Sequence, residues 1–184
     1  MQLYKVAFTG HRPPKIGGYN KDNPLRIAVR QAIKDTLQRI IDTHKDCEVV
    51  VISGGALGVD TDAASVADEL SLRFIVAAPC KNQDSKWPAE SQQAYQAMCS
   101  AADTELAQEL SANYEGTSGK DGVLYIHDGS YTSFCMQKRN EWMVNNCDEL
   151  VAIWDSTPGG TANCVNFAKL IGCKITRIHP GDLL

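Results

Sequence analysis

Ser53-Gly54-Gly55-Ala56-Leu57-Gly58-Val59-Asp60 is the stretch that decides the fold of this chain. It follows the apolar, β-branched run of residues 48–52, which is typical of a buried strand. It leads into residues 59–67, whose small side chains indicate a closely packed helix. We therefore predict a strand-to-helix turn in which glycines permit positive φ or the close approach of another group. The free N–H groups of the helix start favour a polar ligand, although the glycines can also serve only to shape a tight turn.

Length and composition indicate a globular protein with one domain over residues 1–184. The 43% share of hydrophobic residues argues against a disordered chain, and no apolar run approaches the roughly 20 residues that span a bilayer. The net charge of −4 argues against broad electrostatic binding to nucleic acid or to an anionic membrane. The seven cysteines show no C-x-x-C pair and no zinc-type spacing, so we expect no metal site and a cytoplasmic protein with reduced thiols.

Short apolar strands and helical segments alternate along the chain. Strands are predicted at residues 3–9, 48–52, 73–78, 122–127, 149–154 and 174–178. Helices are predicted at residues 24–44, 59–67, 88–98, 134–146 and 159–172, with a polar helical piece after residue 101 and an exposed loop at 113–120. This alternation predicts an α/β fold: a Rossmann-like, doubly wound, mostly parallel sheet with helices on both faces.

The helix over residues 24–44 has the clearest local signals. Asn23 is the predicted N-cap, and Pro24 occupies the first helical position. An apolar stripe at i, i+4 spacing is formed by Leu25, Val29, Ile33, Leu37 and Ile41. Its charged residues, among them Arg26 and Arg30, are predicted to form a solvated face.

Polar or glycine-rich sequences follow several of the predicted strands. Because the carboxyl ends of parallel strands meet at one edge of the sheet, we expect these sequences to converge on one ligand site. Arg12 is suited to an anion contact or to a surface ion pair. The candidate ligand-binding residues are Thr9, Gly10, His11, Arg12, Ser53, Gly54, Gly55, Ala56, Gly58, Asp60, Pro79, Arg139, Asn140, Asp155, Gly159, Gly160 and Thr161.

The two glycine turns differ in charge. The helix after Gly58 begins with Asp60 and Asp62, whose carboxylates oppose an anion, whereas the helix after Gly160 has no acid in its first turn. We therefore predict a phosphate at residues 159–161. Ribose or base is predicted at the first turn, with Asp60 accepting from a hydroxyl. Replacement of either Gly55 or Gly160 by alanine is then expected to weaken ligand binding.

Several candidates also have a purely structural interpretation. Asp60 can act as a helix cap, and His11 can serve as a hydrogen-bonding residue rather than as an acid–base group. Arg139 and Asn140 can belong to a polar helix face. Trp154 is suited either to the strand core or to stacking on a base. The residues alone leave these alternatives open.

Four motifs in this order resemble the YpsA/YoqJ-like proteins of the SLOG superfamily. The motifs are Thr9-Gly10-His11-Arg12-Pro13, Ser53-Gly54-Gly55-Ala56-Leu57-Gly58-Val59-Asp60, Arg139-Asn140-Glu141-Trp142-Met143-Val144 and Gly159-Gly160-Thr161. The superfamily includes cytokinin-activating phosphoribohydrolases of the LOG type, the DNA-processing protein DprA and sensor domains for nucleotide signals. The resemblance implies a Rossmann-like fold and a nucleotide-type ligand.

One departure from the LOG type bears on catalysis. LOG-type enzymes resemble one another in a Pro-Gly-Gly-x-Gly-Thr-x-x-Glu motif, whose Glu serves hydrolysis of the N-glycosidic bond. This chain has Pro158-Gly159-Gly160-Thr161-Ala162-Asn163-Cys164, and neither Cys164 nor Val165 can replace that carboxylate. Whether the chain is an enzyme is thus left open, and no catalytic residue is assigned.

The sequence-based hypothesis is a protein that binds a nucleotide or a nucleotide-derived small molecule, such as an ADP-ribose-type signal, at the C-terminal edge of the sheet. Its expected role is to sense or sequester that ligand, with no cofactor required. The alternatives are a hydrolase of nucleotide N-glycosidic bonds that uses Asp60, Asp155 or Glu90, and a DprA-like nucleic-acid accessory protein. Nucleic acid and membrane are not expected partners, and a homo-oligomer is compatible with the sequence.

Overall fold

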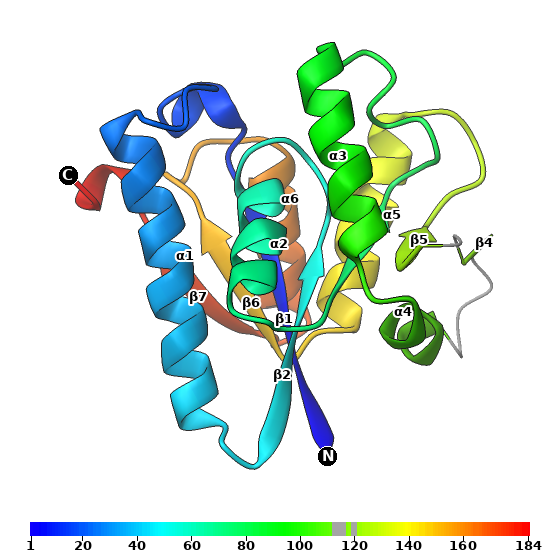
Figure 1. Ribbon diagram of the computed structural model, residues 1–184, viewed down its shortest axis with the longest axis horizontal. Helices are drawn as coiled ribbons and strands as arrows, with labels where there is room; N and C mark the ends of the chain where they lie inside the picture. The colour runs from blue at the N-terminus through cyan, green and yellow to red at the C-terminus, as the bar shows by residue number, and fades with distance from the viewer. Residues whose placement is uncertain (112–116, 119–120) are drawn as a thin grey trace.

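One seven-stranded sheet runs through the structure, a computed structural model that describes residues 1–111, 117–118 and 121–184 (Figure 1). The strands are β1 (Gln2–Gly10), β2 (Cys47–Ser53), β3 (Phe74–Ala78), β4 (Thr117–Ser118), β5 (Val123–Tyr125), β6 (Glu149–Ile153) and β7 (Lys174–Ile178). Their order across the sheet is β4-β5-β3-β2-β1-β6-β7. All neighbouring pairs are parallel except β4 and β5, so the predicted mostly parallel sheet is confirmed.

The exception lies in the segment that the sequence predicts as a loop. Thr117 pairs with Tyr125, and Ser118 pairs with Leu124, in antiparallel register. The loop prediction is therefore wrong for residues 117–118, because pairing with β5 supplies hydrogen-bond partners that no local pattern indicates. The rest of the predicted loop, residues 113–116 and 119–120, lies outside the described residues.

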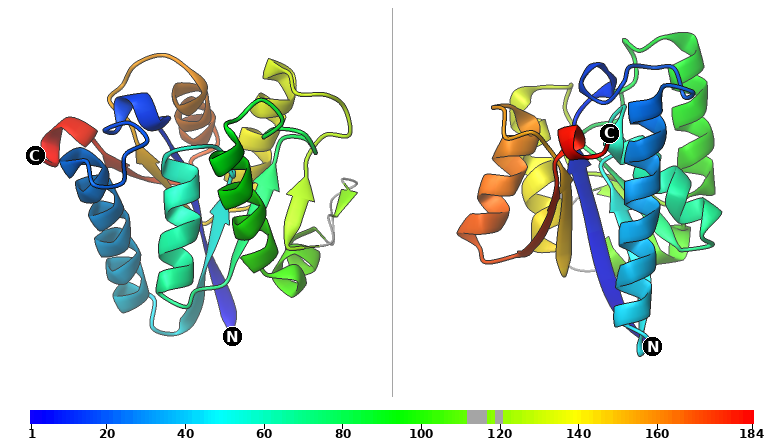
Figure 2. Two further views of the ribbon diagram at one scale, coloured as in Figure 1. Left: turned by 45° about the horizontal axis from the view of Figure 1, so that its top comes forward. Right: turned by 90° about the vertical axis from the view of Figure 1, so that its left-hand side faces the viewer.

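Helices cover both faces of the sheet, as predicted. They are α1 (Pro24–Thr43), α2 (Val59–Glu69), α3 (Ala89–Ala101), α4 (Thr104–Ser111), α5 (Ser133–Asn145) and α6 (Gly160–Leu170), with short 3₁₀ turns at Pro13–Lys15 and Pro180–Asp182. The right-hand view of Figure 2 shows α1 on one side of the strands and α5 and α6 on the other. None of the helices in the described parts of the chain is long and apolar enough to cross a membrane.

Two hydrophobic clusters, one on each face, hold these layers together. Val49 and Val51 of β2 join the cluster that includes side chains of α1, α2 and α3. Val50 and Ile52 of the same strand join the cluster that includes side chains of α4, α5 and α6. A strand buried on both faces needs apolar residues at every position, which explains the continuous run at residues 49–52.

Helix α1 confirms one sequence prediction and corrects another. The side chain of Asn23 accepts a hydrogen bond from the backbone N–H of Leu25 at 2.9 Å, as expected of an N-cap. Arg26, in contrast, is buried, with 8% of the residue exposed, and its guanidinium nitrogen Nη2 donates to Oδ1 of Asp62 at 2.8 Å. The packing of α1 against α2 buries this pair, and the periodicity of α1 alone could not indicate it.

The side on which new strands are added to the sheet changes at β1. From β1 the chain proceeds through β2 and β3 to β4 at one edge of the sheet, and β5 then forms between β4 and β3. The chain next crosses to β6 on the other side of β1. The connections that leave the carboxyl ends of β1 and β6 consequently diverge to opposite faces. In open α/β sheets this switch point is where ligands bind.

Candidate functional site

A cavity of about 610 Å³ lies at this switch point, beyond the carboxyl ends of β1 and β6. Its walls come from the end of β1, from the loop that follows β6, from the glycine turn and the start of α2, from the first half of α5 and from the first turn of α6. The structure thus gathers side chains from segments far apart in the sequence. The predicted site residues that line the cavity are Thr9, Gly10, His11, Arg12, Ala56, Asp60, Arg139, Asn140, Gly159, Gly160 and Thr161.

A buried charged pair forms part of the cavity wall. Nη1 of Arg139 donates to the carbonyl oxygen of Gly54 and lies 3.7 Å from Oδ2 of Asp60. Both side chains are more than nine-tenths buried. Burial raises the pKa of Asp60, and the positive charges of Arg139 and Arg12 only partly oppose this rise. Arg139 therefore lies buried in the cavity wall rather than on a solvated helix face.

The first turn of α6 forms an open part of the cavity wall. Gly159, the N-cap, has φ of 144°, and a Cβ added at Gly159 or at Gly160 would meet nothing within 4 Å. No acidic residue lies in this turn. Asn140 donates from Nδ2 to the carbonyl oxygen of Gly160 at 3.2 Å, which fixes the helix start relative to α5. An anion can therefore approach the free N–H groups of α6 closely.

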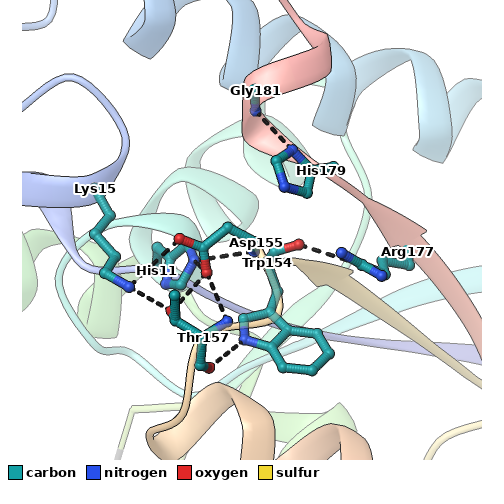
Figure 3. Close-up of polar contacts among 8 residues, drawn as sticks. All are labelled: His11, Lys15, Trp154, Asp155, Thr157, Arg177, His179 and Gly181. Atoms are coloured by element: carbon teal, nitrogen blue, oxygen red, sulfur yellow. Dashed lines mark hydrogen bonds and ion pairs between the residues drawn. The ribbon is translucent and has the colours of Figure 1, made fainter.

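His11 lines the cavity, whereas Asp155 does not. Figure 3 shows the contact between the two side chains. Nε2 of His11 lies 2.6 Å from Oδ1 of Asp155, which also accepts from the backbone N–H and the hydroxyl of Thr157. These bonds hold the pKa of Asp155 well below its usual range. Burial lowers the pKa of His11, and the Asp155 carboxylate offsets this only in part.

Lys15 and Trp154 extend this network, as Figure 3 shows. Nζ of Lys15 lies 3.4 Å from Oδ2 of Asp155 and also contacts the hydroxyl of Thr157. Trp154 donates from Nε1 to the carbonyl oxygen of Thr157 at 2.7 Å, and the guanidinium of Arg177 lies 5.3 Å from its ring. Trp154 is buried and does not line the cavity, so its strand-core interpretation holds.

The glycine turn at residues 53–58 packs mainly against other parts of the protein, and of its residues only Ala56 lines the cavity. Ser53 accepts from the backbone N–H of Gly55 at 3.0 Å and donates to the carbonyl oxygen of Asp60 at 2.8 Å. A Cβ on Gly55 would lie 2.8 Å from Val76. The sequence pattern predicts that this whole turn contacts the ligand. That pattern does not distinguish glycines that pack against protein from glycines that face a ligand. The predicted residues absent from the cavity lining are Ser53, Gly54, Gly55, Gly58, Pro79 and Asp155.

The sequence did not identify one entire wall of the cavity. Tyr131, Ser133, Met136 and Gln137 line the cavity from the segment that follows β5 and from the first turns of α5. The available signal was the polar run 128–133 after a predicted strand, which is one more strand end at the same edge of the sheet. Lys15, Thr157 and Asn163 also line the cavity from segments next to predicted site residues.

Of the acids proposed for a hydrolase, only Asp60 lines this cavity. Glu90 lines a different hollow, between α2 and α3, and Asp155 is held by His11 and Thr157. In the described ranges 1–111 and 121–184, no three side chains of His, Cys, Asp or Glu gather in a way that could hold a metal ion.

Comparisons with known proteins agree with this architecture. The model of the YspA SLOG family matches residues 6–170. The chain belongs to the YspA SLOG family. Among the relatives of this SLOG protein, the SPbeta prophage-derived protein YoqJ of Bacillus subtilis is 30% identical over 165 residues, covering 86% of this chain and 91% of YoqJ. The Bacillus subtilis protein YpsA is 24% identical and covers 85% of this chain and 78% of YpsA.

Solved structures of DNA processing protein A share the fold of this SLOG protein. The protein from Streptococcus pneumoniae superposes with a TM-score of 0.62 at 17% identity, covering 96% of this chain and 50% of that protein. The protein from Helicobacter pylori, whose structure addresses its single-stranded DNA binding mode, superposes with a TM-score of 0.59 at 20% identity. The match covers 95% of this chain and 64% of that protein. This chain therefore spans about half to two thirds of those proteins.

Proposed function

We propose that this protein binds a nucleotide or a nucleotide-derived small molecule in the switch-point cavity, as a sensor or a sequestering protein. The observation that carries the proposal is the first turn of α6. This turn opens into the cavity, contains no acid, and has no side chain between its N–H groups and an approaching anion at Gly159 and Gly160. A helix start of this kind favours a phosphate group.

The remaining walls suit the rest of such a ligand. Asp60 supplies buried carboxylate oxygens in the cavity that the α6 turn also lines, and carboxylates accept hydrogen bonds from sugar hydroxyls. Arg12 lines the mouth with an exposed guanidinium, which can contact a second phosphate such as that of an ADP-ribose-type ligand. The volume of about 610 Å³ falls in the range of small-molecule sites.

Calorimetry with adenosine, AMP and ADP-ribose tests the proposal. We expect AMP and ADP-ribose to bind more tightly than adenosine by at least about tenfold, because only they carry a phosphate for the α6 turn. Equal affinity for adenosine and AMP would overturn the phosphate assignment. No heat of binding with any nucleotide in a wider panel would overturn the proposal as a whole.

A hydrolase of nucleotide N-glycosidic bonds is the second candidate function. The observation in its favour is Asp60, a buried carboxyl group with a raised pKa at the cavity wall, because general acids are tuned in this way. Against it, α6 carries Cys164 and Val165 where LOG-type enzymes have a Glu. We expect no release of free base from nucleoside monophosphates. Base release that Asp60→Asn abolishes would instead establish the hydrolase.

Binding of single-stranded DNA is expected to be weak. The net charge of −4 opposes a polyanion, and nothing beyond the shared fold links this chain to the DNA binding of its structural neighbours. A mobility shift at physiological salt measures this directly. Sub-micromolar binding there would favour a nucleic-acid role over a small-molecule ligand.

A further inference from the structure

An exposed aromatic ring, that of Tyr131, lies on a part of the cavity wall that the proposed function has not used. Tyr131 lines the cavity, yet 48% of the residue is exposed to solvent. It lies between β5 and α5, at the same carboxyl edge of the sheet as the α6 turn. Met136 and Gln137 line the cavity from the following helix. The cavity thus has an open aromatic surface in addition to its anion-binding turn.

The backbone beside Tyr131 is held in place by the start of α5. Thr132 is the N-cap of this helix, and its side chain accepts a hydrogen bond from the backbone N–H of Cys135 at 3.2 Å. In return, the backbone N–H of Thr132 donates to Sγ of Cys135 at 3.1 Å. A capping box of this kind orders the chain that enters the helix. The ring of Tyr131 is therefore presented from an ordered backbone, which lowers the entropic cost of binding a ligand against it.

Phe134, three residues further on, is equally open but has other neighbours. It is 59% exposed, and it does not line the cavity. Its ring makes an edge contact with His127 at 5.9 Å, and Nζ of Lys138 lies 5.3 Å from the ring centre. Of these two open rings, only that of Tyr131 is available to a ligand inside the cavity.

We propose that Tyr131 is the stacking surface for the base of the bound nucleotide, an inference that rests on the proposed function. The phosphate lies at the α6 turn, the sugar lies beside Asp60, and the base lies against Tyr131 near the start of α5. Base–aromatic stacking tolerates any base, because every base presents a π-face. Ser133 and Gln137, on the same wall, can hydrogen-bond the edge of the base. The ligand class is therefore a base-containing nucleotide rather than a sugar phosphate.

The test compares AMP with ribose 5-phosphate, which lacks only the base, by calorimetry on folded protein. The wild-type protein is expected to bind AMP more tightly than ribose 5-phosphate. Tyr131→Ala should weaken AMP binding by about tenfold and leave ribose 5-phosphate binding unchanged. Tyr131→Phe should retain AMP binding, since it keeps the ring. Phe134→Ala is the matched control, because it removes a neighbouring exposed ring outside the cavity.

The possible outcomes separate this inference from the proposed function. If AMP and ribose 5-phosphate bind the wild type equally, or if Tyr131→Ala leaves AMP binding intact, the stacking role is wrong while the phosphate site stands. If neither compound binds, the stacking role is wrong, and the proposed function fails as well if no nucleotide of the wider panel binds. If Tyr131→Ala and Phe134→Ala instead weaken the binding of an oligothymidylate while AMP does not bind, the exposed rings serve single-stranded nucleic acid.

Discussion

Asn140 donates from Nδ2 to the carbonyl oxygen of Gly160 at 3.2 Å and thereby joins the middle of α5 to the first residue of α6. Oδ1 of the Asn140 amide accepts from Nε of Arg139 at 3.0 Å. Nη1 of Arg139 in turn lies 3.7 Å from Oδ2 of Asp60. One continuous set of polar contacts therefore runs from the α2 start to the α6 start. These contacts hold Asp60, which the proposal places beside the sugar, in a fixed position relative to the first turn of α6, to which the proposal assigns the phosphate.

Gly160→Ala is expected to weaken AMP binding at least about tenfold, or about 1.4 kcal/mol, with little change in melting temperature. The added methyl group meets no protein atom within 4 Å, so it occupies space that the phosphate would use. Calorimetry and thermal melts measure the two effects. Asn166→Ala, at an exposed position of the same helix outside the cavity, is the matched control. Unchanged AMP affinity of folded Gly160→Ala would place the phosphate elsewhere.

Gly55→Ala is expected to act on stability, which revises the sequence-based expectation that it would act on ligand binding. Gly55 has φ of 69°, and its added Cβ would lie 2.8 Å from Val76 and 2.9 Å from Gln83. Strain and overpacking should each cost about 1–3 kcal/mol in unfolding free energy. Gly18→Ala, with φ of 81° and open space around the added Cβ, measures the strain alone. A Gly55 variant no less stable than the Gly18 variant would refute the packing argument.

Arg139→Met is expected to lower the free energy of unfolding by about 3 kcal/mol, because it removes the cation that lies 3.7 Å from the buried Asp60 carboxyl group and leaves only the charge of Arg12 to oppose the cost of that burial. The double variant Asp60→Asn/Arg139→Met removes the uncompensated charge, so it should recover most of this loss. Urea unfolding of the two single variants and the double variant gives the coupling energy. Additive losses would show that the two side chains do not interact across 3.7 Å.

Acid should destabilise the protein partly through Asp155. The pKa of Asp155 is held below its usual range by its bonds to Thr157 and His11, so this group stabilises the fold at neutral pH. Below about pH 4 the unfolded chain binds a proton at this position that the folded chain does not, and stability falls with pH. Asp155→Asn should lose less stability than the wild type between about pH 6 and pH 3 in urea unfolding. An identical loss in both proteins would contradict the assignment.

Local patterns in the sequence determined the alternation of strands and helices, the N-cap at Asn23 and the edge of the sheet at which the cavity lies. Each depends on a few neighbouring residues, through side-chain periodicity, helix capping or the free N–H groups of a helix start. The motifs around His11 and Gly160 could therefore be placed at one edge of the sheet from the sequence, because each follows a strand of a parallel sheet, and both line the cavity there.

Tertiary structure alone decided which of these residues face the cavity. Arg26 became a buried partner of Asp62 because α1 packs on α2, and Gly55 became a packing position because Val76 of the neighbouring strand lies against it. Tyr131 joined the site because the β5–α5 connection ends at the same edge as the α6 turn. These relations join segments distant in the chain, and they depend on strand order and helix packing, which no local periodicity specifies.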